Sequence, residues 1–283
     1  MLQGKYYFYK GNKESDNAYQ AITSFYAHKR THTITDANYI FPYGGDGSML
    51  GTLKTLLETM RQQDPKDRWP TQVLGIHYGG KNSKGYLMNP PLDDSFDLSS
   101  MVQEAQCVTF YPLEAKITDV NGQVFSRSAL NDIVLEKHSL TNQASLLDVS
   151  VYDSNGNKTI QTQTAGNGLI TCTWAGSYAY NFKAHGKEIP LSSPNKIGIH
   201  PICDILAESS ISKHLDDTSV VEIHVLNPEK RPVVAFADNE TCVQNVSHCK
   251  IWMNKEIGLP GLLGKDNPII KRQALLSALQ NSR

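Results

Sequence analysis

The spacing of hydrophobic residues changes once along this chain, and the change limits the folds open to it. Residues 1–100 alternate between short apolar runs typical of strands and longer segments with helical spacing. Strands that alternate with helices indicate a parallel sheet. We therefore predict an α/β domain with a Rossmann-like parallel sheet over residues 1–100. Its predicted strands are Lys5–Tyr9, Ala37–Pro42 and Val73–His77, and its predicted helices are Asn17–His28 and Ser48–Arg61.

The second part of the chain has the pattern of β-structure. After residue 100 helical spacing nearly disappears, and short β-branched runs alternate with turns that contain Asn121-Gly122 and Asn155-Gly156. We predict an all-β domain over residues 101–264, so the chain is α+β overall. The segment from Asn267 onward again has a helical pattern, and residues 265–283 are expected to pack back on the first domain.

Charge and cysteine usage exclude several classes of partner. The 27 basic and 28 acidic residues nearly cancel, so no net field attracts nucleic acid or an anionic membrane. The five cysteines are widely spaced and form no CxxC pair, which argues against a disulfide framework and a zinc site. We expect reduced thiols. The chain begins without a signal-peptide pattern and has no apolar run near the ~20 residues of a membrane span. A cytoplasmic protein is predicted.

The turn Gly44-Gly45-Asp46-Gly47 is the segment most suggestive of chemistry. It follows a predicted strand directly and opens a predicted helix, so its glycines and the helix N-terminus suit a phosphate. A carboxylate beside phosphates is unfavourable for binding alone, but it suits a general base that takes a proton from an attacking hydroxyl. Asp46 is therefore the candidate catalytic residue. The alternative is a tight turn in which Asp-Gly only supplies the backbone angles.

Several segments together resemble the NAD kinase family. The GGDG turn alone resembles a superfamily that also contains diacylglycerol-type lipid kinases and phosphofructokinases, so it indicates phosphoryl transfer without naming the acceptor. The other segments are similar to NAD kinase motifs and occur in that family's order. They are Gly75-Ile76-His77 with Gly85-Tyr86-Leu87, Ala129-Leu130-Asn131-Asp132, Gly168-Leu169-Ile170, and Gly176-Ser177-Tyr178-Ala179-Tyr180-Asn181.

The resemblance implies an enzyme that phosphorylates the 2′-hydroxyl of the adenosine ribose of NAD to give NADP. It implies Asp46 as the base, with Gly44, Gly45 and Gly47 forming the phosphate loop. The dinucleotide-binding residues that it implies are Tyr86, whose ring would lie against the dinucleotide, Asn131 and Asp132 for the adenosine, Asn167 for the nicotinamide end, and Ser177, Tyr178, Ala179 and Tyr180.

Two residues depart from the family pattern. Tyr178 stands where the family has Thr, and Asn167 stands where many members have Asp. Because a tyrosine cannot fill the volume of a threonine, either the adenine pocket is reshaped or Tyr178 turns outward. Departures of this kind also keep open a non-catalytic dinucleotide-binding or regulatory protein. A soluble lipid kinase that shares the GGDG loop is the second alternative.

The expected ligands follow from the same resemblance. NAD is the acceptor, and the donor is ATP, another triphosphate or polyphosphate. No Walker A pattern and no closed set of metal ligands occur in the sequence, which agrees with Mg²⁺ that arrives with the nucleotide. The resemblance further implies a homotetramer or homodimer.

Overall fold

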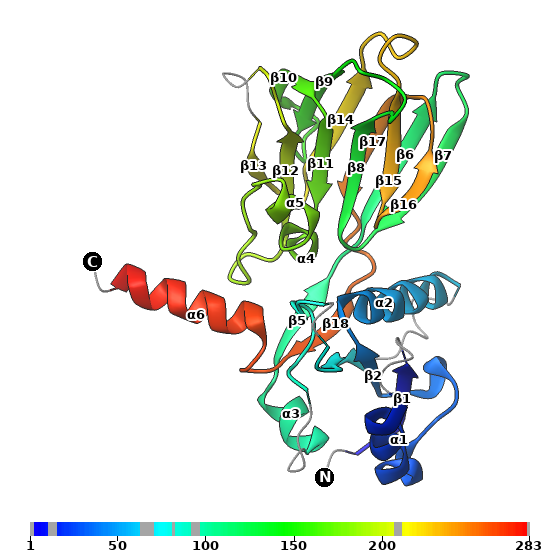
Figure 1. Cartoon of the computed structure of the whole chain (residues 1–283), viewed down its shortest axis with the longest axis vertical. Helices are drawn as coiled ribbons and strands as arrows, with labels where there is room; N and C mark the ends of the chain where they lie inside the picture. The colour runs from blue at the N-terminus through cyan, green and yellow to red at the C-terminus, as the bar shows by residue number, and fades with distance from the viewer. Residues whose placement is uncertain are drawn as a thin grey trace. The chain divides into compact units, whose positions relative to one another are not determined.

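The computed structural model describes residues 3–10, 16–62, 71–80, 83–91, 97–206 and 211–281. The chain divides into two compact units (Figure 1). Unit 1 contains Met1–Phe110 together with Ile257–Arg283, and unit 2 contains Tyr111–Glu256. Unit 1 has a largely parallel sheet with helices, and unit 2 contains only antiparallel sheets. The predicted fold class, an α/β domain followed by an all-β domain, is confirmed.

The sheet of unit 1, called sheet A, has the strand order β1-β2-β3-β18-β5, with β4 paired to β2. All of its pairs are parallel except the one between β18 and the edge strand β5. The strands are β1 (Tyr6–Lys10), β2 (Tyr39–Gly44), β3 (Gln72–Val73), β4 (Ile76–His77), β5 (Gln106–Phe110) and β18 (Leu259–Leu263). The helices are α1 (Asp16–Phe25), α2 (Asp46–Arg61), α3 (Leu98–Glu104) and α6 (Pro268–Asn281), with two short 3₁₀ turns at Ala27–Lys29 and Ile34–Asp36.

Pro42 explains why the predicted strand Val73–His77 is two strands. The backbone N–H of Leu74 donates to Ile40 O at 2.9 Å, and the next rung of that parallel ladder would need an N–H at residue 42. Proline has none, so the ladder is interrupted. Pairing resumes with β4, where Tyr43 lies opposite Ile76. The break places β4 and the end of β2 beside the glycine-rich turn.

The boundary between the two units lies later than residue 100. Strands β5 and β18 pair with each other in sheet A, whereas the sequence pattern predicts an all-β domain over residues 101–264 that contains both. A short apolar run shows that a strand forms but not which sheet it joins, because pairing between distant segments leaves no local pattern. The tail joins unit 1 through the first turn of α6, where Ile269 is fully buried. Farther along, the Leu275 side chain is 62% exposed.

Unit 2 is a sandwich of two six-stranded antiparallel sheets. Sheet B has the order β10-β9-β14-β17-β6-β7, and sheet C the order β13-β12-β11-β8-β15-β16. One core cluster contains side chains from both sheets, among them Leu147, Ile223 and Leu135. The elements are β6 (Leu113–Asp119), β7 (Val124–Ala129), β8 (Asp132–Lys137), β9 (Ser145–Tyr152), β10 (Lys158–Gly166), β11 (Gly168–Cys172), α4 (Trp174–Ser177), α5 (Tyr180–Lys183), β12 (Lys196–Ile202), β13 (Lys213–Asp216), β14 (Val220–Val225), β15 (Val233–Ala237), β16 (Glu240–Val243) and β17 (Val246–Met253).

The Asn-Gly turns connect neighbouring strands of sheet B, as the sequence predicts. Gly156 joins β9 to β10 with φ of 79°, a backbone region that favours glycine. Asp153 opens this turn by accepting hydrogen bonds from the backbone N–H groups of Asn155 and Asn157, each at 2.9 Å.

Candidate functional site

Asp46 lies in the first turn of α2, immediately after β2. The helix begins two residues earlier than Ser48, with Gly45 as its N-cap residue. The Oδ1 atom of Asp46 accepts from the backbone N–H of Leu87 at 2.8 Å, and its Oδ2 atom accepts from the Ser83 hydroxyl at 3.2 Å. The carboxylate is half-buried. Two donors from one loop therefore fix its orientation, and each oxygen keeps a further lone pair for a proton.

Ser83, in the same loop as Leu87, makes further hydrogen bonds that hold the loop against the start of α2. Its Oγ atom also accepts from the backbone N–H of Asp46 at 3.1 Å and from that of Gly85 at 3.2 Å. A Cβ atom at Gly45 would lie 2.6 Å from the Ser83 Cβ, so the loop can approach only a glycine there. Gly47 is exposed, and a Cβ atom at that position would meet nothing within 4 Å. The helix N-terminus is thus open to a ligand at Gly47.

Tyr86 belongs to the same loop and is half-buried. Its backbone oxygen accepts from Asn267 Nδ2 at 3.1 Å, and the same amide donates to Met88 O at 2.8 Å. Asn267 itself is fully buried. The structure therefore brings Gly44, Gly45, Asp46, Gly47 and Tyr86 together in unit 1, with the residue before α6 anchoring the loop that carries Tyr86.

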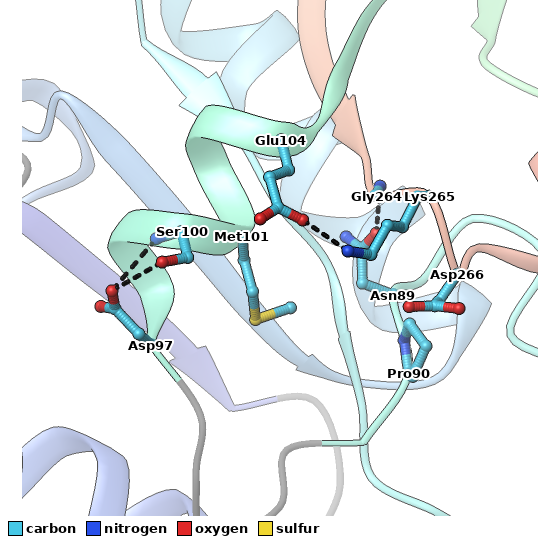
Figure 2. A pocket seen from close by; sticks show the side chains of 9 residues that line it. All are labelled: Asn89, Pro90, Asp97, Ser100, Met101, Glu104, Gly264, Lys265 and Asp266. Atoms are coloured by element: carbon cyan, nitrogen blue, oxygen red, sulfur yellow. Dashed lines mark hydrogen bonds and ion pairs between the residues drawn. The ribbon is translucent and has the colours of Figure 1, made fainter.

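A pocket of about 230 Å³ in unit 1 is formed by other residues (Figure 2). Its charged side chains are engaged with neighbours. Lys265 Nζ lies 2.9 Å from Glu104 Oε2, and Asp97 caps α3 by accepting from the backbone N–H groups of Ser99 and Ser100. None of the residues singled out in the sequence lines it, so this pocket receives no role in the chemistry.

In unit 2, the segment from Leu130 to Asp132 is held from two sides. The Asp238 carboxylate accepts from the backbone N–H groups of Leu130, Asn131 and Asp132 at 2.8, 2.7 and 3.3 Å. On the other side, Thr173 Oγ1 donates to Leu130 O at 2.6 Å, and its backbone N–H donates to Asn131 O at 2.8 Å. The segment that carries the Asn-Asp pair is therefore rigid, because three distant parts of the sequence meet there.

The side chains of this pair are buried and underused. Among the described residues, Asn131 Oδ1 is a buried acceptor without a hydrogen-bond partner. Asp132 is 2% exposed, and burial, followed by the nearby carboxylates of Asp238 and Glu136, raises its pKa to about 7. Buried polar atoms are rarely left unpaired, so the free oxygen of Asn131 fits a ligand that donates a hydrogen bond, such as an amino group or a hydroxyl.

Helix α4 approaches the same segment closely. A Cβ atom at Gly176 would lie 2.0 Å from Asn131 O. Ser177 is fully buried, and its hydroxyl donates to Trp174 O at 2.6 Å and accepts from the Ile189 N–H at 3.0 Å. The donor of this hydroxyl is therefore used, and only its second lone pair remains for a ligand. The Tyr178 side chain is 5% exposed and packs inward, so the possibility that it turns outward is wrong.

Ala179 and Tyr180 complete this region as half-buried residues at the start of α5. The Tyr180 hydroxyl donates to Glu136 Oε1 at 2.7 Å. Burial, and next this hydrogen bond, raise the pKa of Tyr180 well above its ordinary value. Its ring, like that of Phe236, packs against a buried apolar cluster that includes Ile170. The small Ala179 therefore lies beside a neutral phenol that remains available as an acceptor.

Asn167 lies away from the Asn-Asp pair. Its backbone oxygen accepts from the Lys137 N–H at 2.8 Å, and Lys137 ends β8, the strand that Asp132 begins. Five residue steps at about 3.4 Å separate the two ends of that strand by roughly 17 Å. The Asn167 side chain is exposed. The structure thus places it at the other end of β8 from Asn131 and Asp132, near Glu136, whose carboxylate accepts from the Tyr180 hydroxyl.

No family model matches the chain. A relative called NAD kinase from Rhizobium meliloti (strain 1021) is 32% identical over 245 residues, which cover 87% of this chain and 85% of the relative. The chain belongs to the NAD kinase family. The NAD kinase of Rickettsia bellii (strain OSU 85-389) is 30% identical, with 93% of each chain covered.

Solved structures support the family fold. A yeast NADH kinase complexed with NADH gives a TM-score of 0.66 at 17% identity and covers 95% of this chain and 85% of its own. An NAD kinase from Archaeoglobus fulgidus in complex with ATP gives 0.65 at 16% identity, with 95% and 96% covered. Family membership favours neither the lipid kinase nor the non-catalytic alternative. Among the described residues, no helix has the length and apolar character needed to cross a membrane.

Sequence reasoning assigned no supporting role to three residues that hold the candidate groups in place. These are Ser83 beside Asp46, and Thr173 and Asp238 around Asn131. Asp238 and Asn239 form the two-residue turn between β15 and β16, and both have positive φ. An Asp-Asn pair between two strand patterns is a recognisable turn signal, but only the folded sheet shows which N–H groups the carboxylate meets.

Proposed function

We propose that this member of the NAD kinase family phosphorylates the 2′-hydroxyl of the adenosine ribose of NAD to give NADP. The observation that carries the proposal is the Asp46 carboxylate, held by Leu87 N–H and Ser83 Oγ at the N-terminus of α2 and next to the open Gly47. A carboxylate fixed beside a phosphate-binding helix end is poised to accept a proton.

The reaction assigns a definite task to Asp46. As the ribose 2′-oxygen attacks the terminal phosphorus of the donor, its proton passes to a carboxylate oxygen of Asp46. The bond between that phosphorus and the leaving oxygen breaks, and the shortened donor departs. The glycines at positions 44, 45 and 47 would let backbone N–H groups and the helix dipole of α2 stabilise the phosphates.

Unit 2 would supply the groups that hold the dinucleotide. The unpaired Oδ1 of Asn131 would accept from the adenine amino group or a ribose hydroxyl, and Asp132 would accept from a ribose hydroxyl. Ala179, Tyr180 and the residues before them would bound the adenine. Asn167, at the other end of β8, suits the nicotinamide end because a dinucleotide is elongated.

Magnesium would enter with the nucleotide. In the described part of the chain, one group of His, Cys, Asp or Glu side chains lies close enough to hold a metal, and it is on sheet B. The glycine-rich turn offers only the carboxylate of Asp46. A cation that keeps waters and binds the donor phosphates fits such a loop. Bound with the nucleotide, it would neutralise phosphate charge.

The purified protein is expected to form NADP from NAD and Mg-ATP. A coupled NADP-specific assay measures this directly, with NADH as a second acceptor and polyphosphate as a second donor. Boiled protein and a reaction without donor are the controls. No turnover with either donor across Mg²⁺, Mn²⁺ and Ca²⁺ would contradict the proposal, as would phosphorylation of diacylglycerol in place of NAD.

We further propose a cytoplasmic homodimer or homotetramer. The four described cysteines Cys107, Cys172, Cys203 and Cys249 are free, as expected of a reducing compartment. The oligomer rests on the resemblance to the NAD kinase family described above. Sedimentation at micromolar concentration is expected to give a multiple of 31.4 kDa, and a single monomeric species would disprove this assembly.

A further inference from the structure

Glu222, His224 and His248 form a cluster of metal-binding side chains on unit 2. One ligand atom of each residue lies within 4.8 Å of the other two. His224 and His248 are directly opposite each other on the antiparallel strands β14 and β17, and their ring centroids are 4.5 Å apart. Glu222 is two residues before His224, so it points to the same face of sheet B.

This face is the outer face of sheet B. Ile223, which lies between Glu222 and His224, and Cys249, which follows His248, belong to the buried core of the sandwich. His224 is exposed, whereas Glu222 and His248 are half-buried. The described residues that carry the proposed kinase chemistry in unit 2 lie on sheet C, α4 and α5. The cluster is therefore separate from the chemistry proposed above.

We propose that Glu222, His224 and His248 bind a divalent metal ion, Zn²⁺. Two imidazole nitrogens and one carboxylate oxygen are a ligand set that zinc takes, with a fourth position left to water. Tetrahedral zinc needs its ligand atoms roughly 3.4 Å apart, so small side-chain rotations close the site. Because the ligands come from two adjacent strands, the metal would cross-link β14 and β17.

Two neighbouring charges affect the affinity for a cation: the carboxylate of Asp148 favours binding, and the ammonium group of Lys250 opposes it. Asp148 lies directly opposite His224 on β9, the other neighbour of β14. Lys250 lies opposite Glu222, and its Nζ atom is 3.4 Å from Glu222 Oε1. The lysine occupies one carboxylate oxygen and repels a dication, while the second oxygen remains for the metal. Lys250 thus weakens the site without blocking it.

Equilibrium dialysis of the whole, chelator-treated protein against ZnCl₂ tests the proposal. The wild type is expected to bind one Zn²⁺ per chain at this site. His248→Ala and Glu222→Gln are expected to weaken its binding at least tenfold, whereas Lys250→Gln is expected to strengthen it severalfold because it removes the repelling charge. His214→Ala, which removes an exposed histidine of β13, is the matched control and should bind as the wild type does.

Co²⁺ gives a second readout that does not depend on the number of sites. Its visible absorption in the wild type should show nitrogen ligation that Glu222→Gln alters and His224→Asn, at the exposed position, removes. Equal Zn²⁺ affinity in the wild type, His248→Ala and His224→Asn would overturn the proposal. So would unchanged affinity in Lys250→Gln. Kinase activity is not used in either measurement, so this test and that of the proposed function succeed or fail separately.

Discussion

Asp46→Asn is expected to lower kcat by about 10²–10⁴ while NAD still binds. Asparagine keeps the size of the side chain and can still accept from the Leu87 N–H, now held at 2.8 Å by Oδ1, but it cannot take a proton from the ribose hydroxyl. NAD affinity should hold or rise, because a negative charge beside the ligand phosphates is lost. Single-turnover rates and fluorescence titration with NAD separate the two effects.

Asn131→Ala is the matched opposite, because the alanine leaves a ligand donor unpaired. It should weaken NAD binding by about 1–3 kcal/mol with a smaller effect on the rate of the bound complex. Ser83→Ala should fall between the two, since it removes one hydrogen bond that orients Asp46 but leaves the carboxylate. Near-normal kcat with a raised KM in Asp46→Asn would make Asp46 a binding residue and exclude it as the base.

Through Asp132 the wild type is expected to lose about 2–3 kcal/mol of folding stability between pH 5 and pH 8, and the Asp132→Asn variant should not show this loss. Burial, and next Asp238, raise the pKa of Asp132 from 3.8 to about 7 in the folded protein. Between those two values the unfolded chain gives up its proton while the folded chain keeps it, so stability falls as pH rises. Above pH 7 the full cost, on the order of 4 kcal/mol, is present.

Urea unfolding of the wild type and the variant at both pH values measures this effect. Fluorescence is a suitable signal because Trp174 and Trp252 lie in unit 2. Asp153→Asn is the control. Hydrogen bonds from backbone N–H groups, Asn157 first, lower the pKa of Asp153, so its contribution changes only below pH 4. Equal pH dependence in Asp132→Asn and the wild type would contradict the burial argument.

The sequence predicted the parts of the fold that local patterns determine. Helical spacing predicted α2, and the glycines after the preceding strand predicted the turn at Asp46. Each of these signals lies within one short segment. The Asn-Gly turns of sheet B were predicted for the same reason. The residues from Gly44 to Gly47 lie close to the loop of Tyr86, since the two motifs flank neighbouring strands of one parallel sheet.

The remaining features depend on contacts between distant segments. Nothing near Gln106–Phe110 shows that this strand pairs with Leu259–Leu263. The burial of Tyr178 depends on the packing of α4, and the cluster of Glu222, His224 and His248 forms only when β14 and β17 pair. A search for closely spaced ligands in the sequence misses such a set. Register between strands is a property of the whole sheet, which one segment does not encode.

Because Asp238 holds the backbone of Asn131, local opening near Asp238 would disturb the candidate site. Asp238 lies in the hairpin of β15 and β16, and β16 is an edge strand of sheet C. Edge hairpins open locally at a free energy well below that of global unfolding. When the turn at Asp238 opens, three backbone N–H groups lose their acceptor and Asn131 is released, while β15 remains paired with β8. Heat inactivation can therefore precede any visible loss of secondary structure.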